Sequence, residues 1–247
     1  MRPTYPGSIS YSFGPGPLTP AVRALIILNV AGYLLPLAMP AVSLWLGLVP
    51  ALVVERWWVW QPVSYMFLHG GLFHLLFNML ALWMFGVDLE RQWGTRFFWR
   101  FYFVSGIGAA ITTLVMSLLP FGFAETLYVS VTVGASGAIY GLLVAFAMMY
   151  PHRPIYLYML FPIPARVFVL IIGGISFLSS VTETSGGVAH ATHLGGLLAG
   201  YLYLAGRRGH LLSTVRSQWL RWRLARLRKR FDVHDGGRSG KGGPWVH

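Results

Sequence analysis

The stretch TVGASGAIYGLLVAFAMMY, residues 132–150, carries no charged side chain and holds a serine between small residues near its start. A helix that crosses the hydrocarbon core of a bilayer needs about 20 mostly apolar residues. The stretch therefore predicts a membrane-spanning helix. Comparable apolar runs lie near 21–39, 66–87, 97–119, 165–183 and 188–206. We expect an all-α, polytopic membrane protein built as a bundle of six transmembrane helices.

The composition supports a membrane protein and excludes several chemistries. Of the residues, 55% are hydrophobic and 11% are charged, whereas soluble domains carry about 25% charged residues. The absence of cysteine excludes disulfides, thiolate metal sites and a cysteine nucleophile. No His-Glu-x-x-His motif provides zinc ligands for a metalloprotease. We expect no metal and no other cofactor.

The basic residues indicate an orientation. With the N-terminus inside, the outer loops 40–65, 120–131 and 184–187 contain only Arg56 of the 19 lysines and arginines. Cytoplasmic loops carry the excess of positive charge in membrane proteins. We therefore expect a multi-pass protein with both termini in the cytoplasm. The use of arginine over lysine and the short six-span design favour the plasma (inner) membrane of a prokaryote.

Three regions surround or interrupt the spans. Residues 1–20, rich in Gly, Pro and Ser, predict a flexible cytoplasmic tail. Segment 40–65, which carries four tryptophans, predicts a loop lying in the membrane interface of the six-span domain 21–206. In the cytoplasmic region 207–247, residues 215–231 form an amphipathic basic pattern followed by a flexible tail. This pattern predicts binding to anionic lipids rather than to nucleic acid.

Polar side chains inside spans are costly and usually functional. No Asp or Glu lies mid-span, which removes an aspartyl dyad, and the only lysines, Lys229 and Lys241, lie in the tail, which removes a Ser–Lys dyad. The polar groups that remain are His69, His74, Asn78, Ser136, His190 and His193, with hydroxyls such as Ser105, Thr112 and Ser176.

The depth of each polar group in its span, and the small residues near it, indicate which of these groups form a site. In the expected topology Ser136, His193 and His74 lie near the outer ends of three spans, roughly 6 to 12 Å below the surface at about 1.5 Å per residue. Two G-x-x-x-G pairs, which let helices approach closely in lipid, accompany them. These pairs are Gly137 with Gly141 and Gly196 with Gly200.

A close crossing of these two spans brings a serine to a histidine. A serine hydroxyl needs a neighbouring base to become a nucleophile. We expect Ser136 as nucleophile and His193 as base, because His193 shares the stripe i, i+3, i+7 with Gly196 and Gly200. His190, three residues before His193, remains the competing candidate for the base.

Other polar and aromatic residues of the sequence are expected to support this dyad. His74 and Asn78, four residues apart on one helical face, and the Ser136 backbone N–H are candidate oxyanion donors. The alternative is that His74 and Asn78 form only a buried hydrogen-bonded pair. Tyr140, one turn beyond Ser136, is positioned to stack on the base.

Three separated motifs resemble the rhomboid family of intramembrane serine proteases. They are His74-Leu-Leu-Phe-Asn78, Gly134-Ala135-Ser136-Gly137 and His193-Leu-Gly-Gly196 through Gly200. The resemblance covers about Trp57 to Ala205. It implies a six-helix fold with a water-filled cavity and a dyad of Ser136 and His193.

The resemblance also assigns roles and substrates. It implies an oxyanion site at His74, Asn78 and the Ser136 backbone, stacking by Tyr140, and cleavage of single-span membrane proteins near small, helix-destabilising residues. One departure is Trp60-Gln61, where family members often carry Trp-Arg in the first loop. This departure concerns how the loop is anchored.

Two other functions compete with an endopeptidase. A catalytically idle relative that binds or chaperones membrane helices would lack the nucleophile or the base, and both are present here. A transporter or channel would show inverted repeats or a paired intramembrane charge, and we see neither in the sequence.

Overall fold

The computed structural model describes residues 14–207 except 121, 123, 158–160 and 183–186. The chain divides into two compact units, Met1–Leu204 and Ala205–His247, and only residues 205–207 of the second unit are described. The predicted basic helix 215–231, the flexible tail after it and most of the predicted tail 1–20 lie outside the described residues.

In the described residues, six long helices lie at the positions of the predicted runs. They are α1 (Pro20–Ala38), α5 (Leu72–Trp93), α6 (Thr95–Ser117), α8 (Ser136–Met149), α9 (Ala165–Thr182) and α10 (Gly187–Arg207). Within the described residues, α1, α5 and α6 are long and apolar enough to cross a membrane, whereas Ser136–Met149 and Ala165–Ser179 are shorter apolar helices. The fold is thus mostly helical with membrane-spanning segments, and six full crossings stay a prediction.

The second long helix differs from its predicted bounds, 66–87. Helix α5 starts at Leu72 and ends at Trp93. Residues 65–67 form the short 3-10 helix η1 (Tyr65–Phe67) instead. The prediction was wrong at both ends because it followed the apolar run and did not weigh Gly70-Gly71 as a helix breaker, while the charged end of α5 continues the helix to Gly94.

Glu90, near the end of α5, is buried because it satisfies the first turn of α1. Its carboxylate accepts hydrogen bonds from the Thr19 hydroxyl and from the backbone N–H groups of Ala21 and Val22, at 2.9 and 3.0 Å. The Thr95 hydroxyl donates a further bond at 2.7 Å. A negative charge at a helix N-terminus meets unpaired N–H groups and the positive end of the helix dipole. Glu90 therefore fixes the start of α1 against α5.

The predicted interfacial loop 40–65 folds into three short helices, α2 (Val42–Leu46), α3 (Pro50–Arg56) and α4 (Gln61–Ser64). Gln61 is fully buried. Its Oε1 accepts from the Val49 N–H at 3.0 Å, and its Nε2 donates to the Leu44 carbonyl at 2.9 Å. A neutral amide thus anchors the loop where an arginine is expected from the resemblance.

An antiparallel hairpin that the sequence did not predict interrupts the mostly helical fold. Strands β1 (Pro154–Leu157) and β2 (Phe161–Pro164) pair with Pro154 opposite Pro164. Sequence reasoning treated this segment as a turn-rich connection because it is short and bounded by prolines. Arg153, just before β1, forms an ion pair with Asp88 of α5 at 2.7 Å.

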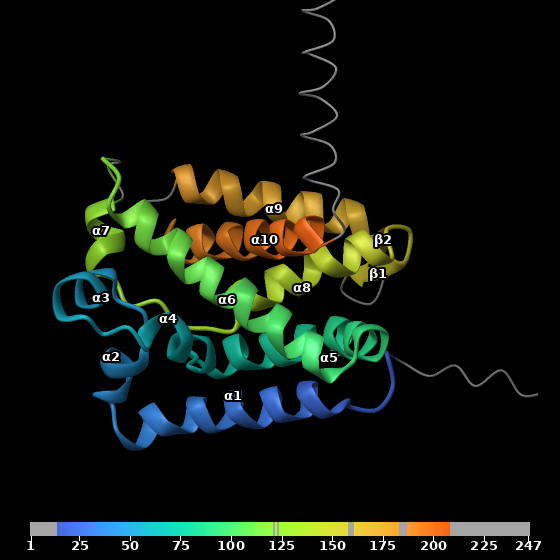
Figure 1. Ribbon diagram of the computed structural model, residues 1–247, viewed down its shortest axis with the longest axis horizontal. Helices are drawn as coiled ribbons and strands as arrows, with labels where there is room; N and C mark the ends of the chain where they lie inside the picture. Colours follow the sequence, from blue (N-terminus) through green and yellow to red (C-terminus); the bar gives the residue numbers. More distant parts are fainter. Residues whose placement is uncertain (1–13, 121, 123, 158–160, 183–186, 208–247) are drawn as a thin grey trace, which may run out of the picture. The chain divides into compact units, whose positions relative to one another are not determined.

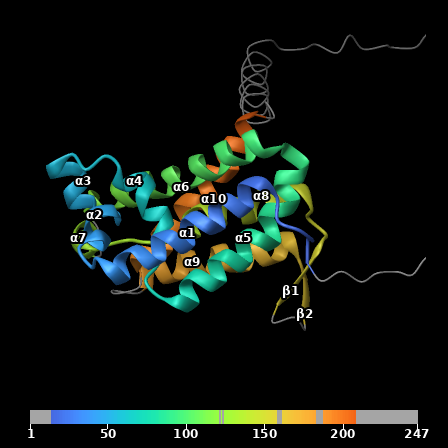
Figure 2. The same ribbon diagram turned by 90° about the horizontal axis from the view of Figure 1, so that it is seen from below.

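The helices of the first unit pack around α6 and α8. Helix α1 lies at one edge beside α5, α9 lies at the opposite edge, and α6 runs obliquely across the middle (Figure 1). The view from below shows α1 in front of the same group of helices, with the β1–β2 hairpin projecting at one end (Figure 2). The short helix α7 (Ala124–Val129) follows α6.

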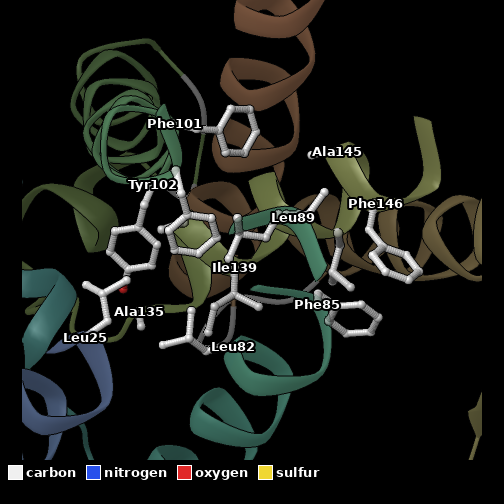
Figure 3. Packing of buried hydrophobic residues seen from close by; sticks show 14 of the residues in the cluster. Leu25, Leu82, Phe85, Leu89, Phe101, Tyr102, Ala135, Ile139, Ala145 and Phe146 are labelled. Carbon is white, nitrogen blue, oxygen red and sulfur yellow. The ribbon is translucent and has the colours of Figure 1, made fainter. Parts of the chain in front are cut away.

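The buried core joins α1, α5, α6 and α8. Leu82 and Phe85 of α5, Tyr102 of α6 and Ile139 of α8 pack together in it (Figure 3). This packing holds the start of α8 in place, and the candidate site lies there.

Candidate active site

Ser136 is the first residue of α8. The chain reaches it through Gly134, whose φ of +132° is a conformation that a side chain rarely adopts. The Gly134 N–H donates to the Tyr65 carbonyl at 3.0 Å. The first N–H groups of a helix have no partner within the helix, so the Ser136 backbone N–H points out of the first turn.

The strand-like segment before Ser136 is held by the interfacial loop. The Leu48 and Thr132 backbones exchange two hydrogen bonds, at 2.9 and 2.8 Å. Gln61 binds the next residue of that loop, Val49. The loop, although far from Ser136 in sequence, therefore fixes the path of the chain into α8.

His193 of α10 lies against the serine. Its Nε2 is 2.8 Å from the Ser136 Oγ. Its other ring nitrogen, Nδ1, is buried and has no hydrogen-bond partner among the described residues. Within the described part of the chain, the arrangement is therefore a two-residue contact in which no carboxylate orients the imidazole.

Glycines allow the approach of α10 to α8. A Cβ atom at Gly196 would lie 2.7 Å from the Gly137 carbonyl carbon, and one at Gly200 would lie 2.8 Å from the Gly141 Cα. Ordinary contacts begin at 3.4 Å. The two G-x-x-x-G pairs thus face each other at a distance that side chains would prevent.

Tyr140 lies on the face of the histidine. Its ring centroid is 4.2 Å from that of His193, with 7° between the ring planes. Its hydroxyl accepts a hydrogen bond from Ser176 of α9 at 3.4 Å. Stacking of this kind limits rotation of the imidazole.

His74 of α5 points toward the turn that precedes Ser136. A Cβ atom at Gly134 would lie 2.9 Å from its Cε1 and Nε2 atoms. The Gly70 N–H donates to its Nδ1 at 3.4 Å. A neutral imidazole that accepts at Nδ1 carries its proton on Nε2, so an N–H donor faces the site.

Asn78, one turn further on α5, is 6% exposed. Its Nδ2 donates to the His74 carbonyl at 2.8 Å. An amide nitrogen carries two hydrogens, so this bond orients the group and leaves a second donor. The hydrogen-bonded pair and the pair of donors, posed as alternatives from the sequence, are compatible in this geometry.

The other two histidines lie beside the site without meeting Ser136. His190 is edge-on to His193 at 5.9 Å between ring centroids, and His69 is edge-on to His74 at 5.0 Å. His69 lies in the loop before α5 and is 7% exposed. Burial, with a smaller contribution from His74, lowers the pKa of His69 from 6.5 to about 4, so this ring is neutral at neutral pH.

No metal centre is formed by the part of the chain that the structure describes, since no three His, Asp or Glu side chains there group closely enough to hold an ion. The described side chains gathered at the site are a serine hydroxyl, imidazoles and a neutral amide.

Sequence reasoning missed two contributors to the site. Ser176 was named only as one hydroxyl among several, and its meeting with Tyr140 depends on how α9 packs. The bridge from Leu48 to Thr132 left no signal in the sequence, because backbone pairing between distant loops is independent of side-chain type.

The chain is similar in sequence to a known family and to several known proteins over the region that holds this site. Residues 56–209 match the rhomboid domain. Rhomboid protein 1, mitochondrial, of Saccharomyces cerevisiae is 33% identical over 74% of this chain and 51% of its own length. Rhomboid protease GluP of Bacillus subtilis is 32% identical over 63% of the chain and 27% of its own length. Rhomboid protease AarA of Providencia stuartii is 32% identical over 59% and 54%.

The chain belongs to the rhomboid family. The family match covers α5 to α10 and the candidate site. The chain spans about half or less of the length of the curated relatives it matches. Two of these relatives are named as proteases.

Proposed function

We propose that this protein is an intramembrane serine endopeptidase in which Ser136 is the nucleophile and His193 the general base. The observation that carries the proposal is the 2.8 Å separation between the Ser136 Oγ and the His193 Nε2. A serine and an imidazole in this geometry form the minimal pair for nucleophilic catalysis. Membership of a family that includes named proteases supports it.

The residues divide the reaction between them. His193 takes the Ser136 proton as the Oγ attacks a peptide carbonyl, and returns it to the leaving amine. Water then attacks the acyl-enzyme, with His193 again taking and returning a proton. The oxyanion of each tetrahedral intermediate is stabilised by the Ser136 backbone N–H, the His74 Nε2–H and the second Asn78 amide hydrogen.

The length of α8 supports cleavage within the bilayer. Its 14 residues span about 21 Å at 1.5 Å per residue, short of the roughly 30 Å hydrocarbon core. A helix that reaches the inner surface therefore starts below the outer surface. Ser136, at that start, lies at the depth of a substrate's transmembrane segment.

The same arrangement supports a class of substrate and an orientation of the chain in the membrane. The substrates are single-span membrane proteins, cut where small residues weaken the helix and expose a carbonyl. Arg23, Arg91 and Arg166 lie at helix ends, and Arg153 lies just before β1, on the side remote from Ser136 in the expected topology. This bias supports cytoplasmic termini in a plasma (inner) membrane, where residues 215–231 contact anionic lipid.

Cleavage of a reconstituted substrate tests the proposal. The full chain is placed in vesicles with a single-span protein carrying Gly and Ala in the outer part of its helix, and the products are sized by mass spectrometry. Wild type is expected to cut inside the helix, and neither Ser136→Ala nor His193→Ala is expected to cut. Cleavage that persists in Ser136→Ala refutes the proposal, while binding of the helix without cleavage by wild type favours the idle helix-binding alternative.

A further inference from the structure

Helix α9 touches the candidate site through one buried polar side chain. Among its described side chains, residues 165–179, only Ala165 and Ser176 are buried. The neighbours of Ser176 on both sides, Ile175 and Phe177, are 56% and 62% exposed. Ser176, at 1% exposed, is therefore the residue that α9 turns inward at the level of the dyad.

A buried hydroxyl in an apolar helix is costly unless it is hydrogen-bonded. The Ser176 Oγ donates to the Tyr140 hydroxyl at 3.4 Å. Tyr140 in turn stacks on His193 at 4.2 Å and 7°. Three helices thus form a chain of contacts that runs from α9 through α8 to the base on α10.

We infer that Ser176 is a positioning residue that couples the position of α9 to the His193 imidazole through Tyr140. This inference rests on the proposed function. With α9 in place, the Ser176 hydroxyl holds the far end of the Tyr140 ring, and the ring holds the imidazole toward Ser136. An outward displacement of α9 breaks the bond and frees the tyrosine ring.

The coupling between Ser176 and the imidazole matters because few other contacts restrain the His193 ring. Its Nδ1 has no hydrogen-bond partner among the described residues. In triads a carboxylate on that nitrogen orients the ring. Here orientation depends on the contact with Ser136 and on the stacked tyrosine, so a group that fixes the tyrosine also fixes the base.

An isosteric pair of variants tests the inference. Ser176→Thr keeps the hydroxyl and Ser176→Val replaces it with a methyl group, so both place the same extra volume in the site. The readout is the rate constant for labelling the full purified chain with a small fluorophosphonate, which needs the dyad but not the docking of a substrate helix. The Ser176→Thr variant is expected to be labelled at nearly the wild-type rate. The Ser176→Val variant is expected to be labelled about two- to tenfold more slowly, which is the effect of losing one hydrogen bond.

A double-mutant cycle isolates the bond itself. Tyr140→Phe keeps the stacked ring and removes the hydroxyl, so it is expected to slow labelling about as much as Ser176→Val does. The combined variant is expected to be no slower than either single variant, since both remove one bond. Ser179→Val, one turn along the same helix, is the matched control and is expected to label within twofold of wild type.

Helix cleavage adds a second readout. Ser176→Val is expected to lower kcat while KM and the thermal midpoint stay near wild type, which a purely structural role would not produce. Equal labelling of the Val and Thr variants, or effects that multiply in the combined variant, overturns the inference. Labelling of wild type but not of Ser136→Ala tests the proposed dyad separately. A negative result for Ser176 would therefore overturn this inference without overturning the proposed function.

Discussion

Replacing Gly196 with alanine is expected to separate the dyad without removing either member. The new Cβ atom would lie 2.7 Å from the Gly137 carbonyl carbon, and ordinary contact begins at 3.4 Å. Because the same Cβ atom would overlap the Gly137 carbonyl oxygen even more closely, helix α10 must move from α8 by more than about 0.7 Å, which would lengthen the 2.8 Å contact between Ser136 and His193 beyond about 3.5 Å. A displacement of about 1 Å at a reacting centre costs up to about 10²-fold in rate.

The assay for Gly196→Ala is the initial rate of helix cleavage in vesicles, with thermal unfolding measured in parallel. We expect a rate reduced by about 10- to 100-fold in a protein that still unfolds cooperatively. Gly174→Ala, where a Cβ atom would meet nothing within 4 Å, is the matched control and is expected to keep the wild-type rate. A folded Gly196→Ala that cleaves as fast as wild type would refute the argument that backbone contact sets the dyad geometry.

Three further predictions concern the base, the loop and pH. His193→Ala is expected to abolish cleavage, whereas His190→Ala is expected to retain a measurable part of the wild-type initial rate. The reverse order of the two rates would make His190 the base. Gln61→Leu is expected to lower the free energy of unfolding by about 1–3 kcal/mol, because buried backbone partners lose their hydrogen bonds; an unchanged denaturation midpoint would contradict this. The folded-state pKa of His69 is about 4 against 6.5, so the unfolded chain binds the extra proton and stability falls as pH drops from 6.5 to 4. His69→Gln should flatten the dependence of the thermal midpoint on pH across this window, and an equal slope in both proteins would rule out His69 as its source.

The parts of the site that follow helical spacing were predictable from the sequence. His193 was preferred over His190 because it shares a stripe with Gly196 and Gly200, and the structure brings His193 to Ser136. The spacing of His74 and Asn78 likewise placed them on one face of α5. These placements could be read from the sequence because spacing within a helix fixes the direction of each side chain.

The features that escaped prediction depend on contacts between distant segments. The bond from Ser176 to Tyr140 and the bridge between Leu48 and Thr132 form only when helices and loops have packed. The late start of α5 at Leu72 and the hairpin after Arg153 arise from local backbone geometry that hydrophobicity does not report. The role of Glu90 could not be read from the sequence, since its partners lie at the start of α1.

The most direct test of the account is the site of covalent labelling by a fluorophosphonate. Full-length wild type, Ser136→Ala and His193→Ala are treated with the probe, digested and mapped by mass spectrometry. We expect one phosphonylated residue, Ser136, in wild type, with labelling strongly slowed in His193→Ala and absent in Ser136→Ala. A label found on another serine, or unchanged labelling after loss of the imidazole, would contradict the claim that these two side chains form the catalytic pair.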